Sequence, residues 1–430
     1  MAWDLAIYAL LGLLILLGGG VWISISLFIA GFVLMQSGLK MPAGPMLATS
    51  TWGYVNNWTL TALPLFVWMG ELLFRSRLSE SLFLSLAPWM RNLPGGLLHL
   101  NVFGCGIFSA VSGSSTATTT TIGQMTLPKL RAAGYDENMS IGSLAASGTF
   151  GLLVPPSGMM IVYAFITETS VIKLFSAGIL PAVMMAVLFS AFIAVRALVR
   201  PSLAPRDETS LTFMQKLALA RHFLPMLLLI AGLMVAMYRG WATATEAAAL
   251  GVLGALILLA VTGGLTWRLL KDATLSAVRT SCMILFVLAG AAFMTVAVGF
   301  SGLPDAITTK INALGLSPIV LIIALTLLYG FLGLFLDGLS MIVLTASTVI
   351  PMVQAAGIDP VWFGIYVVIV VEMSLITPPV GLNLFVLQAI SGQDSLKVAR
   401  AAFPYFLLMV ASIALLIAFP QIALYLPSRL

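Results

Sequence analysis

The stretch SGSSTATTTT, residues 112–121, interrupts a chain in which 60% of the residues are hydrophobic. Nine of its ten residues are Ser, Thr or Gly, and apolar sequence lies on both sides. Small residues allow a tight turn, and hydroxyl groups can satisfy the backbone polar groups that a turn exposes. We therefore expect a helical hairpin, set inside an apolar region, whose tip lies at Ser112–Ser115.

Composition places the whole chain in a lipid bilayer. Only 8% of its 430 residues are charged, whereas soluble domains carry roughly 25%. The first residues lack a basic leader and a small-residue cleavage site, so we interpret them as the start of a retained span. The two cysteines cannot define a disulfide framework or a metal cluster. The net charge of +5 is typical of cytoplasmic loops and does not indicate nucleic-acid binding.

Apolar segments of about 20 residues can span a bilayer. Nine segments are long enough, at 5–37, 58–75, 138–170, 175–199, 216–238, 241–262, 275–300, 361–392 and 401–426. The first of these is either one long tilted helix or two short ones. Two further apolar regions, 96–134 and 317–356, have a polar break near the middle. We expect each of them to be a re-entrant hairpin that enters and leaves the membrane on one side.

This topology also predicts the orientation of the chain. It brings 15 of the 20 basic residues to one face, which the positive-inside rule makes cytoplasmic. Because the number of full spans is odd, the N-terminus is then cytoplasmic and the C-terminus periplasmic.

The chain repeats itself at a spacing of 223 residues without a gap. PKLRAAGYD (128–136) aligns with PMVQAAGID (351–359), and PPSG (155–158) aligns with PPVG (378–381). The predicted topology gives the two copies opposite orientations in the membrane. Inverted repeats with broken helices are typical of secondary transporters.

The predicted fold is an all-α integral membrane protein, an inverted repeat with two re-entrant hairpins and two broken helices. We divide it into N-terminal scaffold helices (1–95), a first transport repeat (96–181, with broken helix 138–170), connecting and scaffold helices (182–300), a second transport repeat (317–404, with broken helix 361–392) and a C-terminal helix (405–430).

The first tip and the first broken helix together predict a cation site. Pro155 and Pro156 lack N–H donors, so carbonyls about one turn earlier lose their partners. Hydroxyl groups and unwound carbonyls suit sodium. We predict that the sodium ligands of this copy are Ser112, Ser114, Ser115, Thr149 and the carbonyl of Val154. For Thr118–Thr121 we favour packing between helices.

The second copy repeats this arrangement, with LFLDGLS (334–340) at the tip and ITPPVGLN (376–383) at the break. It predicts a second sodium site at Asp337, Gly338 and Thr377. Asp337 aligns with Ser114, and it could cap the next half-helix, bind the cation, or do both. Glu372 is open between an ion ligand, a proton carrier and a buried hydrogen-bonded residue. Glu71 and Glu246 lie outside the hairpins, and we expect structural roles for them.

The substrate is expected between the two tips, and we predict that it contacts Gly113, Pro156, Ser157, Pro379 and Asn383. No basic residue lies at either tip. An anionic substrate would therefore depend on helix N-termini and bound cations for its counter-charge. Sodium is the coupling ion in this prediction, and no organic cofactor is expected.

Other chemistries find little support in the sequence. It contains no P-loop and no HExxH motif. An intramembrane serine protease would need His99 or His222 in hydrogen-bond contact with a serine such as Ser112. We treat this as a remote alternative, because both histidines lie outside the tip.

Motifs along nearly the whole chain resemble those of the large membrane subunit of tripartite ATP-independent periplasmic (TRAP) transporters. The matching stretches, in family order, are LPLFVWMGELL, LPGGLLHLNVFGCGIFSAVSGSS, PKLRAAGYD, LLVPPSG, LFSAGILP, ATEAAALG, FLDGLSMIVL, GIDPVWFGI and ITPPVGLNLFV.

This resemblance implies a sodium-driven importer of the elevator type in a bacterial inner membrane. Its substrate would be a small organic anion, such as a carboxylate, a sialic-acid-like compound or a sulfonate. Two partners are implied, a periplasmic substrate-binding protein and a small four-helix membrane subunit, which we expect to be a separate chain. The alternative is a stand-alone sodium- or proton-coupled carboxylate carrier.

Overall fold

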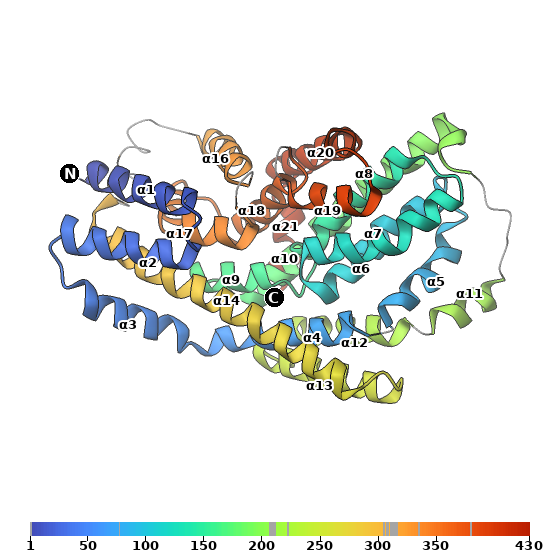
Figure 1. Cartoon of the computed structure of the whole chain (residues 1–430), viewed down its shortest axis with the longest axis horizontal. Coiled ribbons are helices and arrows are strands. Elements are labelled where there is room, and N and C mark those ends of the chain that lie inside the picture. The colour runs from blue at the N-terminus through green and yellow to red at the C-terminus, as the bar shows by residue number, and fades with distance from the viewer. Residues whose placement is uncertain are drawn as a thin grey trace.

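The chain forms a bundle of helices (Figure 1). The computed structural model describes residues 2–76, 78–205, 212–221, 223–303, 306, 309, 317–333, 336–378 and 381–430. Within these ranges every regular element is a helix and no strand is present. The all-α class predicted from the sequence is confirmed.

Most of the helices are short, because turns or breaks interrupt the apolar segments. In chain order they are α1 (Ala2–Gly18), α2 (Ile23–Val33), α3 (Ala43–Val55), α4 (Ala62–Phe74), α5 (Leu78–Met90), α6 (His99–Ser112), α7 (Ser115–Ala132), α8 (Glu137–Gly148), α9 (Gly158–Ile166), α10 (Val171–Val199), α11 (Phe213–Ala220), α12 (Leu224–Tyr238), α13 (Ala244–Val261), α14 (Trp267–Phe300), α16 (Pro318–Leu332), α17 (Gly338–Ala355), α18 (Pro360–Ser374), α19 (Leu382–Ser391), α20 (Ser395–Ala418) and α21 (Gln421–Leu424).

Side-chain caps decide where many of these helices begin. Oxygen atoms of Ser, Thr, Asp or Asn side chains satisfy the free N–H groups of a first helical turn. Such caps precede α7, α8, α9, α10, α11, α13, α14, α16, α17, α18 and α20. Glu246, one of the four acids singled out in the sequence, forms a capping box with Thr243 at the start of α13. Its role is structural, as expected.

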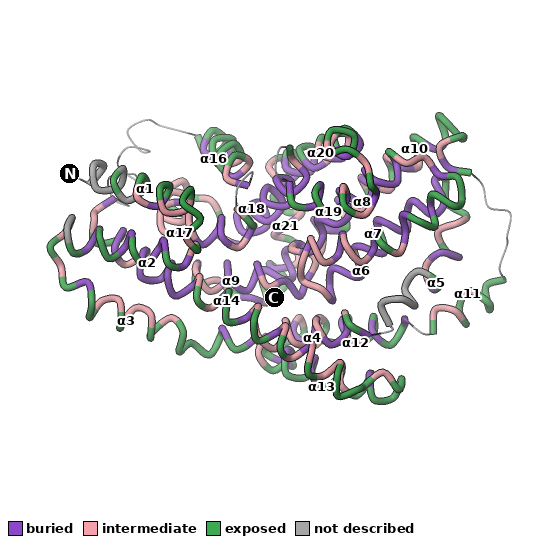
Figure 2. Tube along the Cα trace, viewed as in Figure 1, coloured by how far each residue is buried: buried purple, intermediate pink, exposed green. Residues whose placement is uncertain are grey.

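Two helices, α8 and α18, form the buried centre (Figure 2). All residues from Val361 to Ser374 of α18 are buried, as an all-round apolar helix requires. α8 is rich in Ser, Ala and Gly, and small residues let neighbouring backbones approach closely. It packs against α6, α7 and α20, while α18 packs against α9, α10, α16, α17 and α20.

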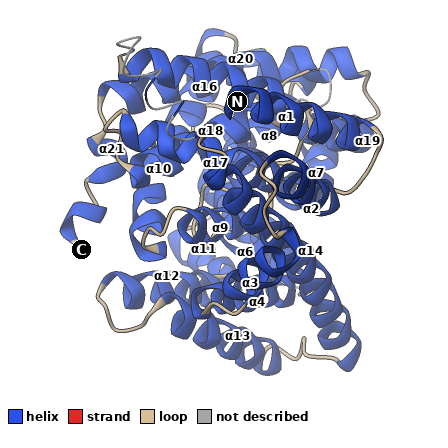
Figure 3. Ribbon diagram, turned by 90° about the vertical axis from the view of Figure 1, so that its left-hand side faces the viewer, coloured by secondary structure: helices blue, strands red, loops and turns tan. Residues whose placement is uncertain are grey.

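The outer helices pack around this centre. α14 runs along α2, α3 and α4, and α4 also packs against α13 and α6. Figure 3 shows α4 and α13 on the side of the molecule opposite to α16 and α20. Glu71 joins α4 to α14, because it accepts a hydrogen bond from Ser276 at 2.8 Å. This is the packing role expected for that acid.

In the part of the chain that the structure describes, five helices, α10, α13, α14, α17 and α20, are long and apolar enough to cross a membrane, and α11 with α12 makes a sixth if the bent pair is one span. The apolar segment 5–37 is two short helices, α1 and α2, so the structure decides between the two alternatives that the sequence left open. Large apolar side chains on these helices face outward, as Val187 does on α10, where it is 60% exposed. The chain is a multi-pass membrane protein.

Candidate functional site

The first predicted tip is a turn between two packed helices. α6 ends at Ser112, and Gly113 follows with a φ of +58°, in the left-handed region that favours glycine. α7 then begins at Ser115, with the Ser114 hydroxyl accepting a hydrogen bond from the Ala117 amide at 3.4 Å. The hydroxyls of Ser112 and Thr118 lie 2.7 Å apart and close the turn. The tight turn predicted from small residues is therefore present.

The first predicted break lies between α8 and α9. The short 3-10 turn Thr149–Gly151 follows α8, and the chain leaves helical geometry before Pro155 and Pro156. The Ser157 hydroxyl donates a hydrogen bond of 2.6 Å to the Leu152 carbonyl. The Leu152 carbonyl would accept a hydrogen bond from the amide of residue 156 in a regular helix, but Pro156 has no N–H. The Ser157 hydroxyl takes the place of that donor. Ser157 also caps α9.

The tip and the break of the first copy touch each other through backbone atoms. A Cβ added at Gly151 would lie 2.2 Å from the Ser115 backbone nitrogen and 2.4 Å from its Cα. Only a residue without a side chain permits this approach. The backbone of the first tip at Ser115 therefore packs directly against Gly151 of the first break.

A buried carboxylate connects the first tip and the first break to the second copy. Oε1 of Glu372, on α18, accepts hydrogen bonds from the Ser115 hydroxyl at 2.7 Å and from the Leu152 amide at 2.8 Å. Glu372 is fully buried, and its Oε2 atom has no hydrogen-bond partner among the described residues. These contacts show a buried, hydrogen-bonded acid, and they leave one of its two oxygens for an ion or a proton.

The second tip begins α17 with Asp337. Its carboxylate accepts hydrogen bonds from the backbone amide and the hydroxyl of Ser340. The cap role is therefore observed, and Asp337 remains exposed. Gly338 packs toward the first break, because a Cβ added there would lie 3.1 Å from Leu152 and 2.6 Å from Val371.

The two tips and the first break line one cavity of about 310 Å³. Polar side chains reach it from both copies and from α4. The predicted site residues among its lining are Ser112, Gly113, Ser114, Ser115, Pro156, Asp337 and Gly338. Residues 223 positions apart in the sequence, such as Ser114 and Asp337, thus meet at one place.

At the second break, a backbone amide instead of a hydroxyl donates to the carbonyl that lacks its helical partner. The Leu375 carbonyl, which aligns with Leu152, accepts a hydrogen bond from the Asn383 backbone amide at 3.1 Å. The Asn383 side chain is fully buried, and neither its oxygen nor its nitrogen has a hydrogen-bond partner among the described residues. The Thr377 hydroxyl donates to the Met373 carbonyl at 2.9 Å. Pro379 lies outside the described residues.

The remaining predicted site residues lie beside the cavity. Thr149, Ser157, Thr377 and Asn383 are not among the residues that line it. Val154 lines a separate apolar groove beside α6, α10 and α12. The Thr149 hydroxyl is buried and donates to the Ala146 carbonyl at 2.6 Å. Leu152 lines the cavity as well, and so does Glu71, for which the sequence predicted only a structural role. A spacing pattern contains no signal for such a contact between distant segments.

The fold matches known transporter structures. The transporter YdaH of Alcanivorax borkumensis aligns with a TM-score of 0.62 at 15% identity, over 88% of this chain and 88% of that chain. MtrF of Neisseria gonorrhoeae, described as one of a class of antimetabolite efflux pumps, aligns with a TM-score of 0.59 at 16% identity, over 91% of this chain and 85% of that chain. The chain therefore shares its fold with these two structures.

Sequence comparison identifies the family. Residues 10–422 match the DctM component of the tripartite ATP-independent periplasmic transporters. The chain belongs to this family of TRAP large permease subunits, and the resemblance noted in the sequence is confirmed.

Its relatives carry different substrate names. The C4-dicarboxylate TRAP transporter large permease protein DctM of Pseudomonas aeruginosa is 32% identical, over 87% of each chain. The ectoine permease protein TeaC of Halomonas elongata is 31% identical, over 86% of each chain. The sialic acid permease protein SiaM of Vibrio cholerae is 29% identical, over 91% of this chain and 90% of its own.

Proposed function

We propose that this chain is the transmembrane subunit of a sodium-coupled importer that takes up a small organic anion. The observation that carries the proposal is the shared cavity, where hydroxyls of the first tip and the carboxylate of the second converge. The names of the relatives support carboxylates or sialic-acid-like compounds as the substrate class.

The residues present fit sodium. A hydroxyl that donates its proton keeps lone pairs that can bind a cation. Ser115 donates to Glu372, so its oxygen stays available as a ligand. Ser112 accepts from the Ser114 amide at 3.3 Å, and its oxygen keeps one lone pair for a cation when its proton goes to Thr118. In the proposal one sodium ion is held near Ser112, Ser114, Ser115 and the Val154 carbonyl, and another near Asp337, Gly338 and Thr377.

Glu372 adds a ligand that the sequence left undecided. An ionised carboxylate is costly to bury unless a cation or hydrogen bonds compensate it. Oε1 has two donors, whereas Oε2 has none among the described residues. We assign to Oε2 either a bound cation or a proton, next to the first sodium site.

Neutralisation by cations explains how an anion crosses. No Lys or Arg is among the described residues that line the cavity, so the positive charge must come from bound cations and from the N-termini of α7 and α17. Sodium then binds first, and the substrate binds between the tips near Gly113, Pro156, Ser157, Pro379 and Asn383. In the elevator mechanism that we propose, the repeats 96–181 and 317–404 move together against scaffold helices in 1–95 and 182–300.

We further propose the partners that this family's name implies. A periplasmic binding protein delivers the substrate, and a small four-helix membrane subunit braces the scaffold in the bacterial inner membrane. The N-terminus would be cytoplasmic and the C-terminus periplasmic. A stand-alone carrier is the alternative, and it predicts uptake into vesicles without any added binding protein.

The protease alternative loses one of its two candidate bases, His99. His99 begins α6 and Ser112 ends it, so they lie about 20 Å apart along the helix. His99 Nε2 contacts the Pro94 carbonyl at 2.7 Å, and His222 lies outside the described residues. Hydrogen-bond contact between Ser112 and His99 is therefore absent.

The test is uptake by proteoliposomes that contain the full-length chain and its membrane partner. The binding protein is added outside, carrying the ligand that thermal-shift screening has identified for it. Uptake should rise sigmoidally with external sodium, because more than one ion is coupled. Choline replaces sodium in the control. Undiminished uptake in choline would exclude sodium coupling.

A further inference from the structure

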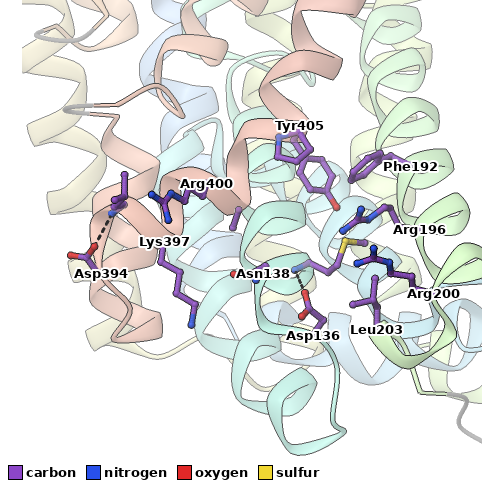
Figure 4. A pocket seen from close by; sticks show the side chains of 14 residues that line it. Asp136, Asn138, Phe192, Arg196, Arg200, Leu203, Asp394, Lys397, Arg400 and Tyr405 are labelled. Atoms are coloured by element: carbon purple, nitrogen blue, oxygen red, sulfur yellow. Dashed lines mark hydrogen bonds between the residues drawn. The ribbon is translucent and has the colours of Figure 1, made fainter.

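A second cavity, of about 610 Å³, lies between α8, α10 and α20 and shares no lining residue with the cavity at the tips. Figure 4 shows Arg400 of α20 on one side of it, and Arg196 of α10 and Arg200, just after the end of α10, on the other. Phe192 and Tyr405 close one end, with their rings 5.1 Å apart. The proposed sodium and substrate sites use none of these residues.

The cavity carries an excess of positive charge. Among the described residues, no carboxylate lies within the 4.0 Å of a salt bridge from Arg196, Arg200 or Arg400. The fourth cation of the lining, Lys397, does have a partner, since its ammonium group lies 3.3 Å from Glu137.

Two acids also face the cavity, and both already have hydrogen-bond donors. Asp136 accepts from the Met139 amide at 2.8 Å, and Asp394 accepts from the Leu396 amide at 3.2 Å. These carboxylates cap α8 and α20. Among the described residues, none of the three guanidinium groups has a carboxylate within salt-bridge distance, and planar guanidinium groups suit the paired oxygens of a phosphate.

The surroundings of the cavity distinguish a lipid from a free anion. On α10, Val195 and Val199 are 57% and 72% exposed, and on α20, Phe403 and Leu407 are 57% and 50% exposed. These side chains lie within one or two turns of Arg196 and Arg400. Apolar surface beside a cationic pocket is the arrangement that a phospholipid fits, with its phosphate in the pocket and its acyl chains along the helices. Basic pockets between membrane helices are known to take anionic headgroups.

We propose that the cavity lined by Arg196, Arg200 and Arg400 binds the phosphate of an anionic phospholipid. The lipid joins α10 to α20 at the membrane surface where the sequence gathers its basic residues. This site is independent of the proposed sodium and substrate sites.

The test uses the full-length chain, with any subunits that co-purify, in detergent micelles titrated with phosphatidylglycerol, phosphatidylcholine or inorganic phosphate. Bound lipid is counted by native mass spectrometry. Phosphatidylglycerol should bind saturably. Each charge removed should weaken its binding about fivefold, so the double variant Arg196→Gln/Arg400→Gln should bind about twenty-fivefold more weakly.

A double variant of two exposed basic residues on α14, Arg268→Gln/Lys271→Gln, removes the same charge elsewhere and should bind like the wild type. If the glutamine variant does not fold, Arg196→Lys/Arg400→Lys keeps the charge but loses the paired donors, and it should bind with intermediate affinity. Equal binding by wild type and pocket variants would overturn the proposal. Phosphatidylcholine binding as tightly as phosphatidylglycerol would also overturn it, as would inorganic phosphate displacing the lipid at equal concentration.

Discussion

The two hairpin tips occupy corresponding positions in the repeat, but they are held differently. Ser115 of the first tip is buried, and it contacts Glu372 through its hydroxyl and Gly151 through its backbone. Asp337 of the second tip is exposed, and its carboxylate bonds only within its own turn among the described residues.

The helices that carry the tips differ in the same way. α6 packs along α7, whereas α16 packs against α18 and α17 packs against α14, α9 and α18. α16 and α17 are joined by a hydrogen bond between the Tyr329 and Thr345 hydroxyls, which lie 2.7 Å apart. The first tip is thus held by side-chain and backbone contacts to other segments, whereas the described side-chain hydrogen bonds of Asp337 stay within its own turn.

The largest loss of uptake is expected at Gly151, where the first break contacts the first tip. Gly151→Ala places a Cβ 2.2 Å from backbone of Ser115, so the tip must shift. Overpacking of this kind costs about 1–3 kcal/mol, and we expect uptake to be nearly abolished. Uptake and the thermal unfolding midpoint in detergent are the measurements.

Two matched variants sharpen this result. Gly338→Ala meets a side-chain atom of Val371 at 2.6 Å, and since a side chain can move, the loss of uptake should be smaller. Gly53→Ala on α3 has nothing within 4 Å of its new Cβ and should behave like the wild type. Equal loss in Gly338→Ala and Gly151→Ala would contradict the contrast between the tips.

The next effect concerns the buried carboxylate. Glu372→Gln keeps an oxygen that can accept from Ser115 and Leu152 but removes the charge. If Oε2 binds a cation, the sodium concentration for half-maximal uptake should rise about tenfold, which corresponds to about 1.4 kcal/mol.

Glu372→Ala is the structural comparison, because it leaves the Ser115 and Leu152 donors without their acceptor, a loss of about 1–3 kcal/mol. It should lower the unfolding midpoint more than Glu372→Gln does. An unchanged sodium dependence in a stable Glu372→Gln variant would reduce the residue to a structural link.

A smaller effect is expected at the two capping positions. Asp337→Asn preserves the cap, since Asn and Asp cap helices equally well, and tests the charge alone. We expect the sodium concentration for half-maximal uptake to rise about threefold, or roughly 0.6 kcal/mol, and to rise less in Ser114→Ala. Surface expression is measured alongside. Normal uptake with unchanged sodium dependence in Asp337→Asn would leave that residue a cap only.

The smallest effect, on the unfolding midpoint, is expected at Glu137, which forms ion pairs with Arg131 and Lys397. Burial raises the pKa of Glu137, but hydrogen bonds from Arg131 and Lys397 outweigh it and lower the pKa overall. A carboxyl group whose pKa is lower in the folded state stabilises the fold at neutral pH, and this contribution is lost as pH falls through that pKa.

Glu137→Gln should therefore lower the unfolding midpoint slightly at pH 7, by the equivalent of at most about 1 kcal/mol because the group is partly exposed. The difference from wild type should vanish between about pH 5 and pH 3. A difference that persists at low pH would assign the effect to packing and not to charge.

The repeat in the sequence made much of the site predictable. Two polar tips and two proline breaks at equal spacing identified Ser112–Ser115, Pro156 and Asp337, and the structure brings them to one cavity. Val154 was predicted through its backbone carbonyl, which stays a prediction, and the residue lines the apolar groove beside α6, α10 and α12. Ser157 was predicted to face the substrate, and its hydroxyl bonds to the Leu152 carbonyl.

The sequence by itself determined the all-α membrane class, the turns and breaks, and the helix caps, because hydrophobicity, proline and capping residues act over a few neighbouring positions. Only the tertiary structure decided that Glu372 bonds to Ser115, 257 positions away, and that Arg196 and Arg400 share a cavity. Such contacts depend on how helices pack, and the packing depends on side-chain shapes along the whole chain, which no local pattern contains.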